Sequence, residues 1–113
     1  MVVPIIQKPW GYEEILSITD HYVMKRMIVN AGHRMSLQYH NEKEETIFVV
    51  SGCLVVWTDD GAPLKLRPGC TYHVKPGEIH RFGAEIDGPV VLIECSTTEL
   101  DDVVRIEDDY SRE

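Results

Sequence analysis

The stretch GHRMSLQYHNEKEETIFVVSG, residues 32–52, sets two strand-like runs around a polar turn, with a glycine at each end. Successive side chains of a strand point to opposite faces, so Gln38 and His40 share one face. After the turn, Glu45 opens a second alternating run. We expect its carboxylate to return beside the imidazole of His40 across an antiparallel pair of strands.

A further histidine, His80, ends the turn Gly77-Glu78-Ile79-His80. Together with Gln38, His40 and Glu45 it forms a set of imidazole nitrogens, a carboxylate and an amide oxygen. Such a set suits zinc, iron, manganese, cobalt or nickel and does not suit calcium. A lone histidine is more often a surface residue or a satisfied buried donor, and the ordered combination is what indicates a metal site. The other histidines, which lack a second ligand at strand spacing, are expected to be structural or superficial: His21, His33 and His73.

Length and composition predict one compact domain, residues 1–113, with 43% hydrophobic residues. No stretch is long and apolar enough to span a bilayer, and the first residues lack a signal-peptide pattern, so a cytoplasmic protein is expected. The net charge of −8 argues against nucleic acid and against an anionic membrane surface as partners. The cysteines have no paired spacing, so disulfides are not expected: Cys53, Cys70 and Cys95.

Alternating and β-branched runs predict an all-β chain. The expected strands are residues 21–30, 34–40, 46–50, 54–58, 71–74 and 90–95, separated by Gly-, Pro- and Asp-containing turns. Residues 13–17 are compatible with a strand or a short helix, and residues 97–102 have no clear preference. The spacing suits a jelly-roll or double-stranded β-helix barrel around a cavity.

The residues resemble the cupin family. The first cupin motif is matched by Gly32, Gln38-Tyr39-His40, Glu45 and Gly52, and the second by Gly69, Lys75-Pro76-Gly77 and His80. Lys75 stands where the family usually has proline, and Ala84 where it often has asparagine. A Gln, His, Glu, His set resembles the zinc ligands of phosphomannose isomerases.

Further segments sharpen the resemblance: Lys8-Pro9-Trp10-Gly11, Ser36-Leu37-Gln38-Tyr39-His40, and the acidic run from Asp101 to Tyr110. From about Gln7 to Arg112 the chain is similar to the type II phosphomannose isomerase domain, the C-terminal half of bifunctional mannose-1-phosphate guanylyltransferase/mannose-6-phosphate isomerase proteins. No glycine-rich nucleotide signature occurs, so we expect a stand-alone version of that domain.

The resemblance implies a metal-dependent isomerase that interconverts mannose 6-phosphate and fructose 6-phosphate, with zinc as the expected ion. A non-catalytic sugar-binding cupin and a non-haem iron dioxygenase are the alternatives, since two histidines and a carboxylate also form the facial triad of oxygenases. Gln38 counts against the oxygenase. A homodimer is expected, because open sheet edges need covering.

A sugar phosphate needs cations at its site. The basic candidates near the expected barrel mouth are Lys25, Arg26, Arg34, Lys43 and Arg81. We select three of them for substrate binding. Arg34 shares a face with Gln38 and His40, Arg81 follows a ligand, and Arg26 falls in a segment resembling a Lys-Arg pair of the family. The catalytic base remains unassigned. The candidates by neighbourhood are His73, Lys75 and Glu78.

Overall fold

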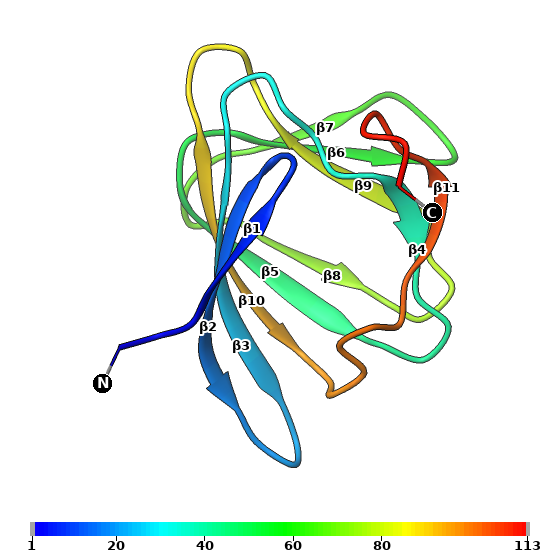
Figure 1. Cartoon of the computed structure of the whole chain (residues 1–113). Helices are drawn as coiled ribbons and strands as arrows, with labels where there is room; N and C mark the ends of the chain where they lie inside the picture. Colours follow the sequence, from blue (N-terminus) through cyan, green and yellow to red (C-terminus); the bar gives the residue numbers. More distant parts are fainter. Residues whose placement is uncertain (1, 113) are drawn as a thin grey trace.

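The computed structural model describes residues 2–112 as strands joined by turns (Figure 1). Within this range no helix occurs, and none is therefore long enough to span a membrane. The ends of the predicted 1–113 domain, Met1 and Glu113, lie outside the described residues.

The strands form two sheets that face each other (Figure 1). The six-stranded sheet has the order β1 (Ile5–Lys8), β2 (Gly11–Ile18), β3 (Val23–Val29), β10 (Val90–Ser96), β5 (Glu45–Ser51) and β8 (Thr71–Val74). The five-stranded sheet has the order β11 (Val104–Glu107), β4 (Leu37–Tyr39), β9 (His80–Ala84), β6 (Leu54–Thr58) and β7 (Leu64–Leu66). All the pairings are antiparallel, and the all-β cupin architecture predicted from the sequence is confirmed.

The core lies between the sheets because each strand turns its apolar side chains inward. In β3 the residues Val23, Met27 and Val29 are buried at alternate positions, and in β5 the same holds for Ile47 and Val49. Burial of one such side chain contributes about 1.5–3 kcal/mol. Some of the inward positions hold buried charged residues in place of apolar ones, such as Lys25 in β3 and Glu45 in β5. These charged residues belong to the site described below.

All six predicted strands are present, those at 54–58 and 71–74 with the predicted bounds and the others with bounds shifted by one to three residues. The ambiguous segment 13–17 is part of strand β2, and residues 97–102 contain no strand. Four strands were not predicted: β1, β7, β9 and β11. Strands β7 and β11 alternate apolar and polar residues but are only 3 and 4 residues long, and β9 begins with His80-Arg81 and contains Gly83, a composition that hides a strand.

The expected pairing of the strands that carry His40 and Glu45 is wrong. Strand β4 belongs to the smaller sheet, where it pairs with β9 and β11, and β5 belongs to the larger sheet, where it pairs with β10 and β8. The turn at residues 41–44 therefore crosses from one sheet to the other. His40 and Glu45 meet across the space between the sheets, where both are buried.

The C-terminal segment packs along the smaller sheet through β11. Val103 and Val104 are half-buried there, whereas Ile106 is exposed. Ion pairs link the segment to the barrel: Asp109 accepts two hydrogen bonds from Arg34, at 2.7 and 3.0 Å, and Glu107 accepts one from Arg81 at 3.2 Å. The segment is thus a wall of the barrel rather than a solvated tail.

The turn between β5 and β6 depends on Gly52, which has a φ of 81°. A Cβ atom there would lie 2.3 Å from the carbonyl oxygen of Pro89, a backbone atom that cannot move away cheaply. Gly69 has a similar φ of 92°, but a Cβ atom added there would meet no other atom within 4 Å. The two glycines therefore differ in packing and not in backbone conformation.

We predict that Gly52→Ala destabilises the protein more than Gly69→Ala. The left-handed backbone costs each variant about 1–2 kcal/mol, and only Gly52→Ala adds a clash with backbone. Urea unfolding of both variants measures the difference. Equal losses in the two would contradict the close approach of Pro89.

Candidate metal centre and cavity

The side chains of His40, Glu45 and His80 converge at one end of the barrel. His40 directly follows β4, Glu45 begins β5 and His80 begins β9. Their potential ligand atoms all lie within 4.8 Å of one another, and all three residues are buried. Oε1 of Glu45 lies 2.8 Å from Nε2 of His40 and 3.9 Å from Nε2 of His80. This cluster can hold a metal ion.

Both imidazoles are oriented by hydrogen bonds to backbone carbonyls. Nδ1 of His40 lies 2.6 Å from the carbonyl oxygen of Asp102, and Nδ1 of His80 lies 3.0 Å from that of Glu78. A carbonyl oxygen can only accept, so each Nδ1 carries a proton and each Nε2 presents a lone pair when the ring is neutral. Metal-bound histidines usually have this arrangement, with the distal nitrogen donating to a carbonyl or carboxylate.

The two Nε2 atoms provide the test of whether the residues fit a metal. Both are buried, and neither makes a hydrogen bond of regular geometry within residues 2–112. When the ring of His40 is neutral, with its proton on Nδ1, the 2.8 Å approach of its Nε2 to Glu45 Oε1 brings two acceptors together, and a metal ion bound to both atoms would relieve their repulsion. Two imidazole nitrogens and a carboxylate oxygen suit zinc and neighbouring transition metals. The residues therefore fit a divalent metal ion.

The environment favours the ligating forms of these side chains. Burial alone would raise the pKa of Glu45, but the neighbouring His40 and Glu94 side chains and the charge of Lys43 hold it well below its usual range. Burial lowers the pKa of His80 and keeps its ring neutral. A carboxylate and a neutral imidazole are the forms that bind metals.

Gln38 lies beside this cluster. It pairs with His80 in the register of β4 and β9, and its side chain lines the same cavity. Its Oε1 accepts a hydrogen bond of 2.6 Å from the hydroxyl of Ser36, which fixes the amide and leaves one lone pair of Oε1 available. The assignment of Gln38 as a fourth ligand stays a prediction.

A cavity of about 100 Å³ lies between the sheets beside the cluster. Its wall combines apolar side chains, among them Trp10, Met27 and Phe82, with a set of charged ones. The charged residues that line it are Lys8, Glu13, Lys25, Lys43, Glu45, Glu94, Asp102, Arg105 and Arg112.

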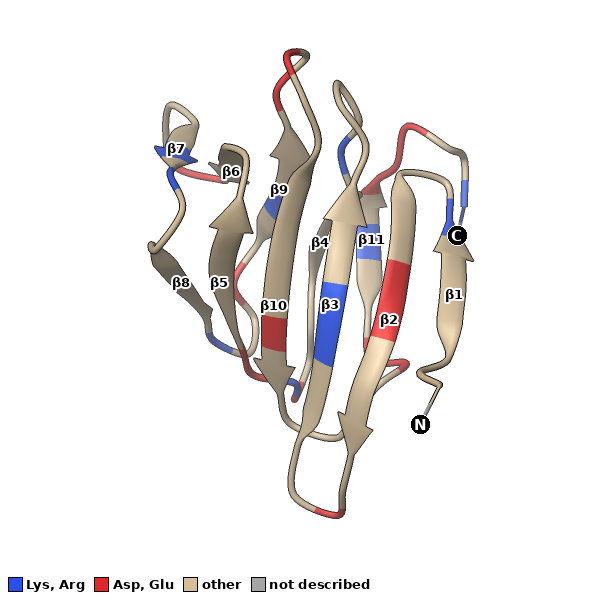
Figure 2. Ribbon diagram, turned by 90° about the vertical axis from the view of Figure 1, so that its left-hand side faces the viewer, with Lys and Arg blue, Asp and Glu red and all other residues tan. Residues whose placement is uncertain are grey.

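Charged residues of alternating sign cross the inner face of the larger sheet. Figure 2 shows charged bands side by side on β2, β3 and β10. Nζ of Lys25 lies 3.1 Å from Glu13, and Nζ of Lys43 lies 3.4 Å from Glu94. Burial, and next the charge of Glu45, raise the pKa of Glu94 to about 8. Burial lowers the pKa of Lys43, but the negative charges of Glu94 and Glu45 outweigh this effect, so the pKa lies above its usual value.

Sequence reasoning named Lys25 and Lys43 as basic residues near the mouth but did not find Glu13 or Glu94. The alternation of residues in the predicted strand 90–95 could have revealed Glu94. Glu94 occupies an alternate position with Val90 and Leu92 in a strand that was predicted, so it had to face the core. A charged residue at a core position of a strand indicates a functional interior.

The arginines selected for substrate binding lie away from this cavity. Arg26 is exposed and makes two hydrogen bonds to Glu14. Arg34 pairs with Asp109 and lies over the ring of Trp57. Arg81 is buried, but it points to the opposite side of β9 from His80 and bonds to Met35 and Glu107. Successive residues of a strand point to opposite faces, so Arg81 points away from the side of β9 on which His80 lies.

The neighbourhood candidates for a catalytic base also lie elsewhere. His73 contacts Glu44 at the surface, and Glu78 accepts a hydrogen bond from the backbone N–H of Lys75 within its own turn. None of the three residues lines the cavity.

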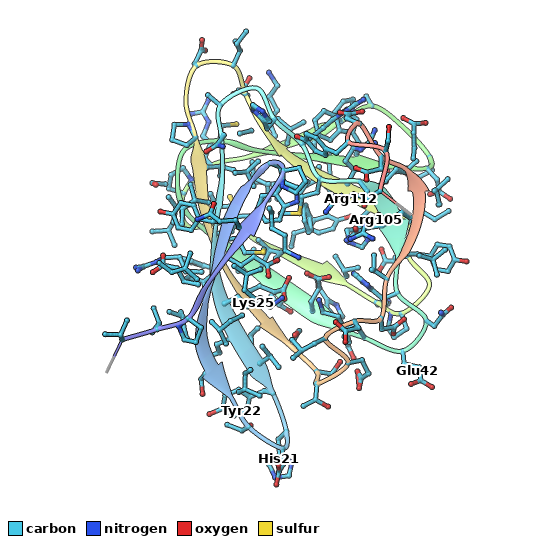
Figure 3. All side chains as sticks on the ribbon, in the orientation of Figure 1. His21, Tyr22, Lys25, Glu42, Arg105 and Arg112 are labelled. Carbon is cyan, nitrogen blue, oxygen red and sulfur yellow. The ribbon has the colours of Figure 1, made fainter. Side chains whose placement is uncertain are left out.

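Cations from the two ends of the described chain lie at the cavity instead. Lys8 comes from β1, Arg105 from β11, and Arg112 from the segment that follows β11 (Figure 3). Arg112 is held by Asp108, 2.9 Å from its Nε, and lies over the ring of Tyr110. Lys8, Arg105 and Arg112 are far in sequence from His40, Glu45 and His80 and belong to no common motif with them. They reach the cavity only through the fold.

Comparisons with known proteins agree with this architecture. Among solved structures, the polyketide cyclase RemF from Streptomyces resistomycificus superposes with a TM-score of 0.81 at 19% identity, over 92% of this chain and 80% of that one. A structure described as a sugar phosphate isomerase from a cupin superfamily, from Silicibacter pomeroyi, gives a TM-score of 0.70 at 23% identity, over 78% of this chain and 59% of that one. Likeness at these identities shows the fold alone.

Sequence relatives are longer proteins. The chain is 33% identical over 110 residues to the xanthan biosynthesis protein XanB of Xanthomonas campestris pv. campestris, and 34% identical over 110 residues to a mannose-1-phosphate guanylyltransferase of Escherichia coli K12. In each case the match covers 95% of this chain but 23% of the relative.

A family profile described as the C-terminal part of mannose-6-phosphate isomerase matches residues 3–108. That range contains both sheets, the His40, Glu45 and His80 cluster and the cation Arg105. The chain therefore belongs to the family of mannose-6-phosphate isomerase C-terminal domains and has the cupin fold.

Proposed function

We propose that this chain is a metal-dependent isomerase that interconverts mannose 6-phosphate and fructose 6-phosphate. The observation that carries the proposal is the buried cluster of His40, Glu45 and His80 beside a cavity, with ligand atoms within 4.8 Å of one another and with both Nε2 atoms buried without a hydrogen-bond partner in residues 2–112. The family assignment and the cations at the cavity support the same conclusion.

The roles follow from the chemistry of each residue. His40, Glu45 and His80 would hold the ion, with Gln38 as a fourth ligand. The ion would act as a Lewis acid toward the sugar carbonyl and the neighbouring oxygen. The backbone carbonyls of Asp102 and Glu78 hold the imidazole rings in place, so little reorganisation is needed when the ion binds.

The phosphate group requires positive charge in a chain whose net charge is −8. Lys8, Arg105 and Arg112 line the cavity and come from its outer side, so we assign the phosphate to these residues rather than to Arg26, Arg34 and Arg81. Guanidinium groups match the geometry of phosphate oxygens, and a preformed pair with Asp108 keeps Arg112 in position.

Zinc is the ion that we propose, because a site with two imidazoles and one carboxylate is typical of catalytic zinc. Mn, Fe, Co and Ni have overlapping preferences. The homodimer and the cytoplasmic location stay predictions.

A non-catalytic sugar-binding role is the second candidate. It is supported by the short match, which covers 23% of the relative named a mannose-1-phosphate guanylyltransferase, so that the activity in that name does not by itself assign catalysis to this part. An iron dioxygenase would use the same three ligands with oxygen and a reductant.

An activity assay distinguishes these functions. We expect conversion of mannose 6-phosphate to fructose 6-phosphate without added oxygen or reductant, lost on chelation and restored by zinc or a similar ion. Metal analysis before and after chelation accompanies the assay. Stoichiometric metal without turnover would favour the binding role, and a requirement for oxygen would favour the dioxygenase.

The ligand assignment has its own test. We expect His40→Ala and His80→Ala to reduce bound metal to background and abolish activity, because each removes an inner ligand. Gln38→Ala should weaken metal binding by a smaller factor, since an amide oxygen is a weaker ligand than imidazole. Cys70→Ser, which leaves the cluster intact, is the control. Full metal content in His80→Ala would refute the assignment.

The phosphate assignment predicts that Arg105→Met raises KM for mannose 6-phosphate by about tenfold or more, because a charge-assisted hydrogen bond contributes about 1.5–3 kcal/mol. Lys65→Met, which removes an exposed cation paired with Glu85, is the matched control. An unchanged KM in Arg105→Met would move the phosphate away from this part of the cavity.

A further inference from the structure

The ion pair between Glu13 and Lys25 has no part in the roles described so far. The two residues lie on neighbouring strands, β2 and β3, and Nζ of Lys25 donates a hydrogen bond of 3.1 Å to Oε1 of Glu13. Their exposed fractions are 8% and 7%, and both side chains line the cavity.

The same two strands carry a second ion pair on their outer face, which provides a comparison. There Arg26 donates two hydrogen bonds to Glu14, at 2.7 and 2.9 Å. In the outer pair the Arg26 side chain is exposed and both carboxylate oxygens of Glu14 are used, whereas the inner pair is buried and is joined by one hydrogen bond. Each pair joins β2 to β3, so linking the strands does not require the inner one.

Stability does not account for the inner pair either. Removing two charges from water costs several kcal/mol for each ion, and replacing a buried ion pair with apolar residues of similar volume is often neutral or stabilising. The neighbouring wall, which includes Trp10 and Met27, would accept such residues. An ion pair at this position therefore indicates a use within the cavity.

The pair retains hydrogen-bonding capacity on the side that lines the cavity. The ammonium of Lys25 has three donors, one of which is used by Glu13, and that hydrogen bond engages Oε1 of Glu13 rather than Oε2. The pair as a whole is neutral. A free anion would be repelled by Glu13 and a free cation by Lys25, so the matching ligand is an uncharged group that both donates and accepts, such as a hydroxyl.

We propose that Glu13 and Lys25 bind neighbouring hydroxyl groups of a polyhydroxylated carbon chain. The proposal rests on the proposed function in taking a sugar phosphate as the ligand of this cavity. The hydroxyls concerned are those between the end of the sugar that faces the metal ligands and its phosphate. Glu13 accepts from one hydroxyl and Lys25 donates to the next, so the pair determines which sugars fit.

The test measures binding with ligands that cannot isomerise. A hexitol phosphate has the hydroxyls and the phosphate but no carbonyl, and hexyl phosphate has the same chain length without hydroxyls. Titration calorimetry with the whole zinc-loaded chain compares the wild type, Glu13→Gln, the double variant Glu13→Gln with Lys25→Met, and Glu14→Gln as the outer-face control.

We expect the wild type to bind the hexitol phosphate more tightly than hexyl phosphate. Glu13→Gln and the double variant should lose about tenfold or more in affinity for the hexitol phosphate, since a site built for hydroxyls loses its partners, and should bind hexyl phosphate unchanged. Glu14→Gln should match the wild type with both ligands. Unchanged binding of hexyl phosphate also shows that each variant is folded. The double variant removes both partners of the ion pair, so neither Glu13 nor Lys25 is left as a buried charge without the other.

The inference is overturned if the wild type does not prefer the hexitol phosphate, if it binds neither ligand, or if the double variant keeps the preference. Failure of the isomerase proposal is a separate result, because these ligands are not turned over. A wild type that binds the hexitol phosphate through Glu13 and Lys25 but leaves mannose 6-phosphate unconverted retains this inference and loses the isomerase.

Discussion

The candidate metal centre depends on the hydrogen bond from His40 Nδ1 to the backbone carbonyl of Asp102. At 2.6 Å it fixes the imidazole ring and its tautomer. The carboxylate of the same residue accepts hydrogen bonds from the backbone N–H groups of residues 41, 42 and 43, which lower the pKa of Asp102. One residue of the C-terminal segment thus holds both a ligand and the turn that leads from β4 to Glu45. The ligands of the cluster are positioned by a part of the chain that contributes no ligand.

Electrostatic compensation explains how the barrel interior tolerates so many ionisable groups. Unit charges about 4 Å apart interact by about 4 kcal/mol at an effective dielectric constant of 20, which offsets much of the cost of burial. Lys25 lies beside Glu13 on the neighbouring strand, and Lys43, from the turn before β5, lies beside Glu94, so each buried lysine has an unlike charge next to it. Glu94 also lies close to Glu45, and its raised pKa relieves the repulsion by favouring a proton on one of the two carboxylates.

The sequence was sufficient for the fold and for the gathering of His40, Glu45 and His80, because strand alternation and turn residues leave clear local patterns. It misplaced the pairing of β4 with β5, since local patterns do not say which sheet a strand joins. It also did not reveal that Arg26, Arg34 and Arg81 lie away from the cavity. Arg34 and Arg81 are near the ligands in sequence, but each is bound by carboxylates of the C-terminal segment. Lys8 and Arg112 approach the cavity only through long-range packing, which no short spacing encodes.

The position of β10 has a kinetic consequence. This strand lies between β3 and β5 in the larger sheet, although it follows both by a long stretch of chain, as the pairing of Val90 with Val29 shows. The inner edges of β3 and β5 must remain unpaired until residues 90–96 arrive. Closing so long a loop is entropically costly, so this step is expected to limit the folding rate. During that interval the open edge of β5, with the exposed side chains of Phe48 and Val50, is where a second unfolded chain would add most easily.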